Sequence, residues 1–396
     1  MIRETLSRIV NKLRTLVSSS IRVAKVYDFS SCPAQVGGIR YNLIETGRKT
    51  ALRDVRLYGE AEVPLLTSNL PDAYWAEVKN GSVIGDSSVV LSPGGFVLYD
   101  MLFHRRSYGA NITDHGLMLL FGRPHFLGKR VFYNYKGREK IAEGISLAAN
   151  MSNNYYHFMF TVASKFFYLS KMNLDAGIPL LVDECVLETT QMREVLQSLN
   201  VSNRKIEPLI AGKKYDVQRL YCISSPNVVV PNFIGGTERL GGFSFDSGAL
   251  DFIRDAFLPG ARREEERGER LFLSRKHCRK RRCNEEDLLP ILEKYGFRTV
   301  FPETMTVREQ AELFNSAEHI IGASGAAFSN LVFCRRNTGV LILESWSSTC
   351  FSALGAAARL KMCYINGEKV SGGQHSDFVV DPGQLAGYLE NYYAGV

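Results

Sequence analysis

The chain has 396 residues, of which 45% are hydrophobic and 22% are charged. This composition is typical of a folded soluble protein and excludes a disordered or fibrous one. Its apolar runs reach only about ten residues, whereas a membrane-spanning helix needs roughly 20, so we predict no transmembrane segment. The formal net charge of +7 fits an anionic partner such as a nucleotide phosphate or a membrane surface.

The length also bears on domain number, because 396 residues exceed what one hydrophobic core usually serves. We therefore expect two packed domains. The eight cysteines are scattered and form no CxxC pair, which argues against a zinc site. The basic N-terminus is not followed by the apolar segment and cleavage site of a secretory signal. These features predict reduced thiols in a cytoplasmic protein.

Residues 1–25 have the pattern of a basic amphipathic helix, and we treat 1–30 as a separate segment. Apolar side chains recur in steps of three and four, at Ile2, Leu6, Ile9, Val10, Leu13, Val17 and Ile21. Six basic residues stand against one acid, Glu4. Such a helix can lie on an anionic membrane surface, or it can pack on the protein's own core with its basic face in water.

The rest of the first half is expected to form one domain over 31–240. Short strands and turns are predicted over 72–148, where β-branched residues alternate with Gly, Asp, Ser and Pro. The elements expected next are a helix over 153–172, a buried strand over 178–184, a helix over 189–200, and short strands at 205–211, 215–223 and 227–231. Asn153 or Asn154 can cap the first of these helices. The alternation predicts a parallel sheet with helices on its faces.

A second domain is expected over 260–380, where strands and helices alternate more clearly. Its elements in chain order are a strand over 270–275, a helix over 284–296, a strand over 297–303, a helix over 306–317, a strand with a Gly-rich turn and a helix start over 319–334, and a strand over 338–345. Asn284 is the expected cap of the first helix, and Thr306 with Glu309 fits a capping box. This run of βαβ units predicts a doubly wound parallel sheet. The charged stretch 260–270 indicates a surface loop between the domains.

Ligands of an open α/β sheet bind at the carboxyl ends of its strands, and the first such end in the second half carries a basic cluster. The cluster consists of Arg275, Lys276, Arg279, Lys280, Arg281 and Arg282. Guanidinium groups match phosphate oxygens bidentately, and a helix N-terminus follows, so we predict a diphosphate site. The alternatives are a solvated basic loop and a nucleic-acid surface. No aromatic residues interleave with the cluster, so no nucleic-acid partner is expected.

Two further strand ends carry candidate binding groups. The stretch 322–330, GASGAAFSN, has small residues that let the backbone approach a ligand, and amides at the following helix start can bind an anion. It lacks the GxGxxG spacing and the P-loop lysine, and tight strand–helix packing is the alternative. Glu344 ends the last strand, where its carboxylate could bind sugar hydroxyls, with Glu303 as a similar candidate. Helix capping or a surface ion pair is the alternative for Glu344.

In the first half, His157 follows an Asn-rich turn near the start of a predicted helix. An imidazole titrates near neutral pH and can remove a proton from a hydroxyl group. The alternative is a buried, hydrogen-bonded histidine among Tyr155, Tyr156 and Phe158.

Four segments together resemble glycosyltransferase family 61 in their order and spacing. They are NNYYHFMF, LFLSRKHCRKRRCNEEDLLPILEKYGFRTVFPE, TVREQAELFNSAEHIIGASGAAFSNLVF and GVLILE, within about residues 150–345. The resemblance implies a GT-B fold, in which two Rossmann-like domains face a cleft, here after a β-rich N-terminal lead-in. It also implies an inverting transfer from a nucleotide sugar, usually a UDP-sugar, with no cofactor and no bound metal.

The resemblance assigns roles by position. Arg275 and Arg281 would face the diphosphate, while Asn284 and Glu285 would hold their loop. The residues expected at the donor site are Arg275, Arg281, Asn284, Glu285, Glu303, Gly322, Ser324, Gly325, Ala326, Asn330 and Glu344. His157, or an acid that the sequence does not locate, is the expected catalytic base. Thr161 stands where the family often has an acid four residues after the histidine, and Ser324 replaces the histidine of a His-Gly-Ala turn.

The expected function is therefore transfer of a hexosyl or pentosyl group to a glycan or lipid-linked glycan in capsule or other surface-polysaccharide synthesis. The setting expected for it is the cytoplasmic face of the cell membrane, with peripheral contact through residues 1–25. The alternative is a non-catalytic protein, derived from such an enzyme, that binds a nucleotide sugar or glycan. Thr161 and Ser324 favour that alternative.

Overall fold

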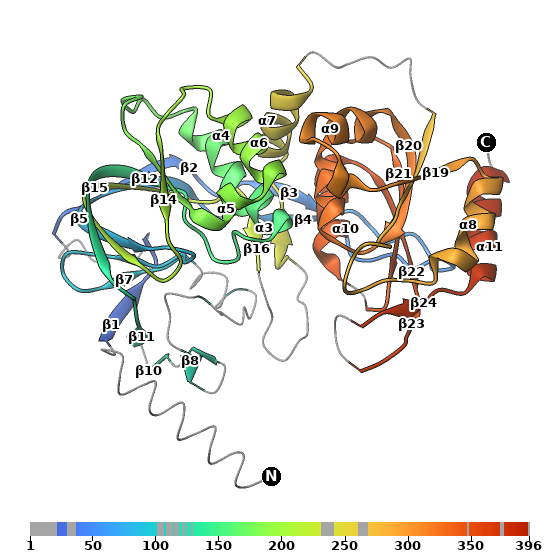
Figure 1. Cartoon of the computed structure of the whole chain (residues 1–396), viewed down its shortest axis with the longest axis horizontal. Helices are drawn as coiled ribbons and strands as arrows, with labels where there is room; N and C mark the ends of the chain where they lie inside the picture. Colours follow the sequence, from blue (N-terminus) through green and yellow to red (C-terminus); the bar gives the residue numbers. More distant parts are fainter. Residues whose placement is uncertain are drawn as a thin grey trace, which may run out of the picture.

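The computed structural model describes residues 22–29, 37–100, 107, 114, 119–120, 123–124, 126–127, 130–230, 241–259, 268–346, 348–372 and 376–394. Within them the chain is a mixed α/β protein, as the sequence predicts. A large mixed sheet lies in its first half and a five-stranded sheet in its second half (Figure 1).

The larger sheet combines antiparallel hairpins with a parallel part. Its eleven strands are β1 (Arg22–Tyr27), β2 (Ile39–Glu45), β5 (Ala73–Ile84), β6 (Val90–Leu91), β7 (Val97–Leu98), β10 (Phe126–Leu127), β11 (Arg130–Tyr133), β12 (Arg138–Ser146), β13 (Leu180–Asp183), β14 (Ile206–Leu209) and β15 (Lys214–Ile223). Strands β5, β6 and β7 are antiparallel neighbours, as the turn-rich sequence predicts. Strands β15, β12, β13 and β14 are parallel neighbours in that order, with β5 antiparallel to β15.

The predicted helix after β12 is present as a continuous helical run. It consists of α3 (Tyr155–His157), the π-helical turn η2 (Phe158–Val162), the 3₁₀ turn η3 (Ala163–Lys165) and α4 (Phe166–Leu169). Asn154 is its cap, because the Asn154 side chain accepts a hydrogen bond from the backbone amide of Tyr156 at 2.9 Å. The other helices of this half are α5 (Glu184–Glu188), α6 (Thr190–Leu199) and α7 (Ser247–Phe257).

The smaller sheet is the doubly wound parallel sheet that the sequence predicts. Its strands, β18 (Glu269–Leu273), β19 (Phe297–Val300), β20 (Ala317–Ala323), β21 (Gly339–Glu344) and β22 (Lys361–Asn366), lie in the order β19-β18-β20-β21-β22. Its helices are α8 (Glu285–Lys294), α9 (Val307–Ser316), η6 (Ala326–Phe333), α10 (Thr349–Ala358) and α11 (Pro382–Ala394). One face of the sheet packs with α9, η6 and α10, and the other packs with α8 and α11. The Thr306–Glu309 capping box is confirmed at the start of α9.

The helices of the two halves pack against each other between the sheets. The largest buried cluster contains Ile145 and Leu180 of the first sheet together with Leu271 and Ile342 of the second. In Figure 1, α6 and α7 lie next to α9. At this contact the backbone amide of Val307 donates to a carboxylate oxygen of Glu194 at 2.6 Å. The two halves are therefore joined by a continuous apolar core with hydrogen bonds at its edge.

Within the described ranges, four short two-stranded sheets lie outside the main ones. They are β3 (Lys49–Leu52) with β4 (Leu66–Asn69), β8 (Leu119–Leu120) with β9 (Arg123–Pro124), β16 (Val228–Val229) with β17 (Phe243–Ser244), and β23 (Glu368–Lys369) with β24 (Phe378–Val379). Near β3, Leu57 forms a parallel bridge with Tyr364 of β22. A segment from the range assigned to the first domain thus lies at the edge of the second sheet.

The structure corrects the prediction of a helix over 1–25 at its end. Residues 22–25 belong to strand β1, where Ala24 and Val26 are buried while Lys25 between them is exposed. Alternating burial is the pattern of a β-strand. Over so few residues, a sequence of basic and apolar side chains fits the period of a strand as well as that of a helix. The rest of the predicted helix, and most of the predicted loop over 260–270, lie outside the described residues.

Candidate functional site

The carboxyl end of β18 begins the basic cluster, and Glu285 fixes its geometry. The two carboxylate oxygens of Glu285 accept hydrogen bonds from Oγ of Ser274 at 2.5 Å and from the backbone amide of Arg275 at 2.6 Å. Glu285 is the first residue of α8, where the helix dipole favours a negative charge. The expectation that Glu285 holds this loop agrees with the geometry.

Asn284 supports the same loop in a different way from the one predicted. It occupies the N-cap position of α8, but its side chain caps no backbone amide of that helix. Instead, Oδ1 of Asn284 accepts from the backbone amide of Val380 at 2.8 Å, and Nδ2 donates to the carbonyl oxygen of Val380 at 3.1 Å. The predicted N-cap position of Asn284 is confirmed, but its side chain binds Val380 and donates to Oδ2 of Asp287 at 2.9 Å instead of accepting from a backbone amide of α8.

Arg275 lies directly against Gly325. A Cβ atom at Gly325 would overlap the Arg275 guanidinium. Gly325 has an extended backbone, with a φ of −175°, so this position needs glycine for space and not for backbone conformation. Nη2 of Arg275 donates to the carbonyl oxygen of Lys280 at 3.0 Å. The Gly-rich turn and the basic cluster, which come from neighbouring strands, are therefore in contact.

Arg281 lies beside Arg275. Burial, and secondly the charge of Arg275, lower the pKa of Arg281 below its usual value. Its guanidinium carbon is 5.6 Å from the centroid of the Trp346 ring. Within the described part of the chain, the buried Nε atoms of both arginines lack a hydrogen-bond partner. Two partly desolvated cations are thus held at the strand ends, where an anion can bind.

Glu344 approaches this pair from the end of β21. Its side chain is completely buried, and its charge partly offsets the lowering of the Arg281 pKa. Oε1 of Glu344 accepts a hydrogen bond from the backbone amide of Ser348 at 3.0 Å, so the carboxylate also fixes the start of α10. Glu344 therefore lies at the predicted site, and part of its function is structural.

The remaining residues of the Gly-rich stretch are mostly enclosed in the fold. A Cβ at Gly322 would come within 2.8 Å of Cβ and O of Leu273, so this glycine allows β18 and β20 to pack closely. Ser324 is buried, and its backbone amide donates to the carbonyl oxygen of Leu343 at 2.8 Å. Ala326 is half-buried and begins η6, next to the Arg275–Gly325 contact.

Asn330 and Glu303 lie away from the arginine pair. Asn330 is completely buried, and its Oδ1 accepts the hydroxyl of Tyr155 at 3.1 Å while its Nδ2 donates to Oε1 of Gln310 at 2.5 Å. This amide links α3 to α9 and η6 across the interface between the halves. Glu303 is exposed after the edge strand β19. The prediction that Asn330 binds the donor is not supported by this geometry, since its amide is enclosed by protein.

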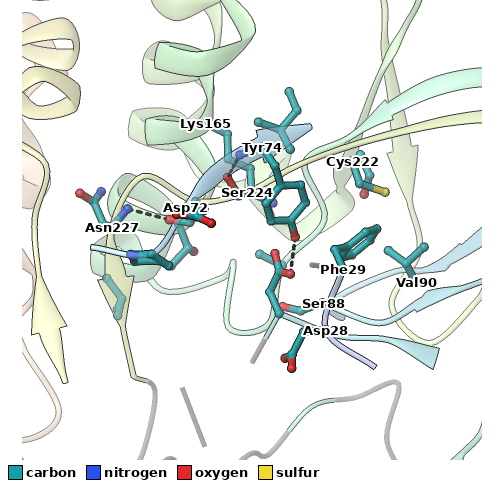
Figure 2. A pocket seen from close by; sticks show the side chains of 18 of the residues that line it. Asp28, Phe29, Asp72, Tyr74, Ser88, Val90, Lys165, Cys222, Ser224 and Asn227 are labelled. Atoms are coloured by element: carbon teal, nitrogen blue, oxygen red, sulfur yellow. Dashed lines mark hydrogen bonds between the residues drawn. The ribbon is translucent and has the colours of Figure 1, made fainter. Parts of the chain in front are cut away.

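His157 lines a cavity of about 440 Å³ in the first half. The cavity lies at the carboxyl ends of β12 and β15, where Ser146 and Cys222 contribute to its wall (Figure 2). The imidazole is 8% exposed, and neither ring nitrogen hydrogen-bonds another described residue. Burial lowers the pKa of His157 to about 4, so the ring is neutral at pH 7. His157 is therefore buried, as the alternative prediction held, but no described residue forms the hydrogen bond to its ring that this alternative requires.

The loop before His157 is held by a buried carboxylate. Asp183 at the end of β13 accepts from the backbone amides of Asp86 at 2.7 Å and Ala149 at 3.0 Å, and from Oγ of Ser152 at 2.8 Å. Burial raises the pKa of Asp183 to about 7 despite these hydrogen bonds. Asp183 thereby fixes the turn that places His157 at the cavity.

Sequence reasoning missed three polar residues of this cavity: Tyr74, Asp100 and Lys165. The hydroxyl of Tyr74 donates to Oδ1 of Asp100. Burial raises the pKa of Asp100 to about 6, although Tyr74 and Lys165 both lower it. Burial likewise lowers the pKa of Lys165. Of the three, only Lys165 could have been found from the sequence. It follows His157 and Thr161 in steps of four, which places the three side chains on one face of the predicted helix.

The comparisons with known proteins concern the family of the chain. Residues 155–341 match the model of the family described as Glycosyltransferase 61. No curated protein matches the sequence. Among the described residues, no helix combines the length and apolar character that crossing a bilayer requires.

Proposed function

The chain belongs to glycosyltransferase family 61 and is thus a glycosyltransferase, and we propose that it uses a nucleotide-sugar donor whose diphosphate binds between Arg275 and Arg281. The observation that carries this proposal is the arginine pair itself. The two guanidinium groups repel each other, and each has a buried Nε that no described residue satisfies. A dianionic group between them would relieve the repulsion and accept bidentate hydrogen bonds.

The finer features of the reaction follow from this assignment. When the bond from the anomeric carbon to the diphosphate breaks, negative charge develops on the leaving oxygen, and the two arginines would stabilise it. We therefore propose a metal-independent reaction with a UDP-sugar as donor, carrying either a hexosyl or a pentosyl group. A single displacement with inversion needs one base at the acceptor, and the first half of the chain supplies a cavity for that purpose.

We place the acceptor in the cavity beside His157. Its neutral imidazole lacks a hydrogen-bond partner among the described residues and can bind an acceptor hydroxyl or take its proton. The acceptor cavity and the arginine pair lie in different halves, which supports a GT-B arrangement with a first domain near 31–240 and a second near 260–380. The acceptor would be a glycan or lipid-linked glycan of a capsule or other surface polysaccharide. The basic sequence of residues 1–25 supports a setting at the cytoplasmic membrane face.

A thermal-shift panel with UDP, GDP, CMP and UMP, each with and without EDTA, tests the donor site. A ligand that binds only the folded chain raises its melting temperature by mass action. We expect UDP to raise it and EDTA to leave the shift unchanged. Arg281→Gln should remove the shift, whereas Arg282→Gln should retain it, because Arg282 is paired with Asp377 at 2.7 Å. A shift with CMP alone would contradict the diphosphate role of the arginines.

Turnover distinguishes an enzyme from a protein that only binds the donor. We expect release of UDP from UDP-sugars to depend on added acceptor glycosides. Donor binding without acceptor-dependent release would favour the non-catalytic alternative.

A further inference from the structure

The cavity beside His157 contains a carboxylate that no step above uses. Thr161 stands where the family often carries an acid, and its hydroxyl donates to the backbone oxygen of His157 at 2.6 Å. A threonine hydroxyl does not accept a proton near neutral pH, so Thr161 cannot replace that acid as a base. A carboxylate base, if the reaction uses one, must come from another part of the cavity wall.

Asp100 lines the same cavity from the chain segment that follows β7. Its Oδ1 accepts the hydroxyl of Tyr74 on β5. Tyr74 is itself fixed, because its backbone amide donates to Oγ of Ser224 at 3.0 Å and its ring stacks on Tyr41 with centroids 4.9 Å apart. Oδ2 of Asp100 has no hydrogen-bond partner within the described residues. One carboxylate oxygen is thus oriented by protein while the other is available to a ligand.

The charged and titratable groups around Asp100 leave it suited to accept a proton. Besides Tyr74, they are Asp28, Tyr41, Asp72, His157, Lys165 and Cys222. Burial raises the pKa values of Tyr41, Tyr74 and Cys222, so all three are neutral at pH 7. Burial and Asp28 raise the pKa of Asp100, whereas Tyr74 and Lys165 lower it, which leaves it at about 6. At pH 7 Asp100 is therefore mostly ionised and still a stronger base than a solvated aspartate.

Two other titratable groups of the cavity, Asp72 and His157, are less suited to this role. Asp72 is exposed, and its Oδ1 accepts the backbone amide of Gly47 at 2.7 Å. His157 has a pKa of about 4, which makes its imidazole a weaker base than Asp100. Asp100 therefore combines a fixed orientation, an available oxygen and a suitable basicity.

We propose, on the basis of the proposed function, that Asp100 is the general base of the transfer and that Tyr74 is its positioning residue. The acceptor oxygen forms a bond to the anomeric carbon of the donor while its proton passes to Oδ2 of Asp100. The bond from that carbon to the diphosphate oxygen breaks, and its electron pair leaves with the diphosphate. His157 donates or accepts a hydrogen bond that holds the acceptor hydroxyl.

Asp100→Asn tests this assignment with little change in shape. The full chain is assayed for UDP release from UDP-sugars with p-nitrophenyl glycosides as acceptors. Loss of a general base costs about 10²–10⁴-fold in kcat, and we expect a loss in that range with unchanged UDP binding. In the wild type, kcat/KM should rise with pH through about 6, the pKa of Asp100, and the variant should lack this dependence. Asp216→Asn is the matched control, since that aspartate accepts Oγ of Ser82 at 2.8 Å and does not line the cavity.

Two further variants separate a chemical role from a structural one. Tyr74→Phe removes a hydrogen bond that lowers the pKa of Asp100, so the rise in kcat/KM should move to higher pH. Asp100→Ala leaves a space that formate can occupy, and added formate should restore part of its activity. A residue that only supports the fold would give neither result.

Full activity of Asp100→Asn, with the pH dependence of the wild type, would overturn the assignment while leaving the proposed function intact. The same holds if the rise lies near pH 4 and disappears in His157→Gln, because His157 would then be the base. If the wild type binds no UDP and releases none with any acceptor, the proposed function itself is wrong.

Discussion

At the scale of single residues, the space at Gly325 decides where the Arg275 guanidinium can lie. The extended backbone of Gly325 tolerates any side chain, but a Cβ atom there would overlap that guanidinium. Gly325→Ala should therefore fold normally and displace Arg275 from the proposed diphosphate site. A hydrogen bond to a charged group contributes about 1.5–3 kcal/mol, so we expect UDP affinity, measured by calorimetry, to fall roughly 10- to 100-fold.

Gly268→Ala is the matched control, because a Cβ at Gly268 would have no atom within 4 Å. That variant should bind UDP as the wild type does. Unchanged UDP affinity in Gly325→Ala would place the diphosphate elsewhere.

A second residue-scale prediction concerns His319, which is completely buried in the smaller sheet. Its Nδ1 and Nε2 each lie 3.0 Å from a tyrosine hydroxyl, those of Tyr393 and Tyr388. Burial, with a smaller effect of Arg270, lowers the pKa of His319 to about 3. Between that value and about 6.5, the pKa of an unfolded histidine, the unfolded chain binds a proton that the folded chain does not. The free energy of unfolding should therefore fall as the pH drops from about 6.5, by up to about 1.4 kcal/mol per pH unit.

Urea unfolding between pH 4 and 7.5 measures this dependence. His319→Phe removes one titrating group and should make the slope smaller, while His157, whose pKa is also lowered by burial, retains its own share. The variant loses two hydrogen bonds and is less stable at pH 7. An unchanged slope in His319→Phe would assign the whole pH dependence to other groups.

At the scale of secondary-structure elements, Asn330 joins α3, α9 and η6 through hydrogen bonds to Tyr155 and Gln310. Asn330→Ala would leave the Tyr155 hydroxyl and the Gln310 amide buried without this partner. Each of these two groups costs about 1–3 kcal/mol, so we expect the free energy of unfolding to fall by about 2–6 kcal/mol. The affinity of the folded variant for UDP should remain that of the wild type.

The variant distinguishes two roles of Asn330: donor binding, which the resemblance implies, and joining of helices, which its hydrogen bonds support. Lost UDP affinity with unchanged stability in Asn330→Ala would restore the donor-binding role. In a double-mutant cycle, Tyr155→Phe should add less than its full effect to Asn330→Ala, because both remove the same hydrogen bond.

The elements that the sequence predicts well are those whose signals are local. The Thr306–Glu309 capping box and the Asn154 cap lie within a few residues of the amides they satisfy, so sequence alone locates them. Asn284 has the same local pattern, but Val380 binds its side chain. The pairing of Tyr74 with Asp100 joins residues 26 positions apart, and the turn-rich sequence predicts the hairpins of β5, β6 and β7 but not which side chains they bring together. The sequence therefore predicted that the basic cluster and the Gly-rich turn lie at strand ends, whereas it did not predict the contact between Tyr74 and Asp100.

At the scale of the whole molecule, the charge of the cavity beside His157, the proposed acceptor site, is opposite to that of the chain. The chain carries a formal charge of +7, and its basic cluster lies at the proposed donor site. The described wall of the acceptor cavity instead contains three aspartates, Asp28, Asp72 and Asp100, against one lysine, Lys165. Carboxylates accept hydrogen bonds from sugar hydroxyls, and aromatic rings such as those of Phe29 and Tyr41 suit the apolar faces of sugars.

We therefore expect the enzyme to prefer an uncharged acceptor sugar to an anionic one of the same shape. A glucoside and the matching glucuronide differ only in a carboxylate, which the aspartates would repel. A penalty of about 1.4 kcal/mol corresponds to a tenfold change in binding, and we expect KM for the glucuronide to be at least about tenfold higher. Asp72→Asn should narrow this difference, because it removes one of the repelling charges at the cavity. Equal KM values for the two acceptors, or a lower value for the glucuronide, would contradict this prediction. The positive charge of Lys165 would then outweigh the aspartates at the bound sugar.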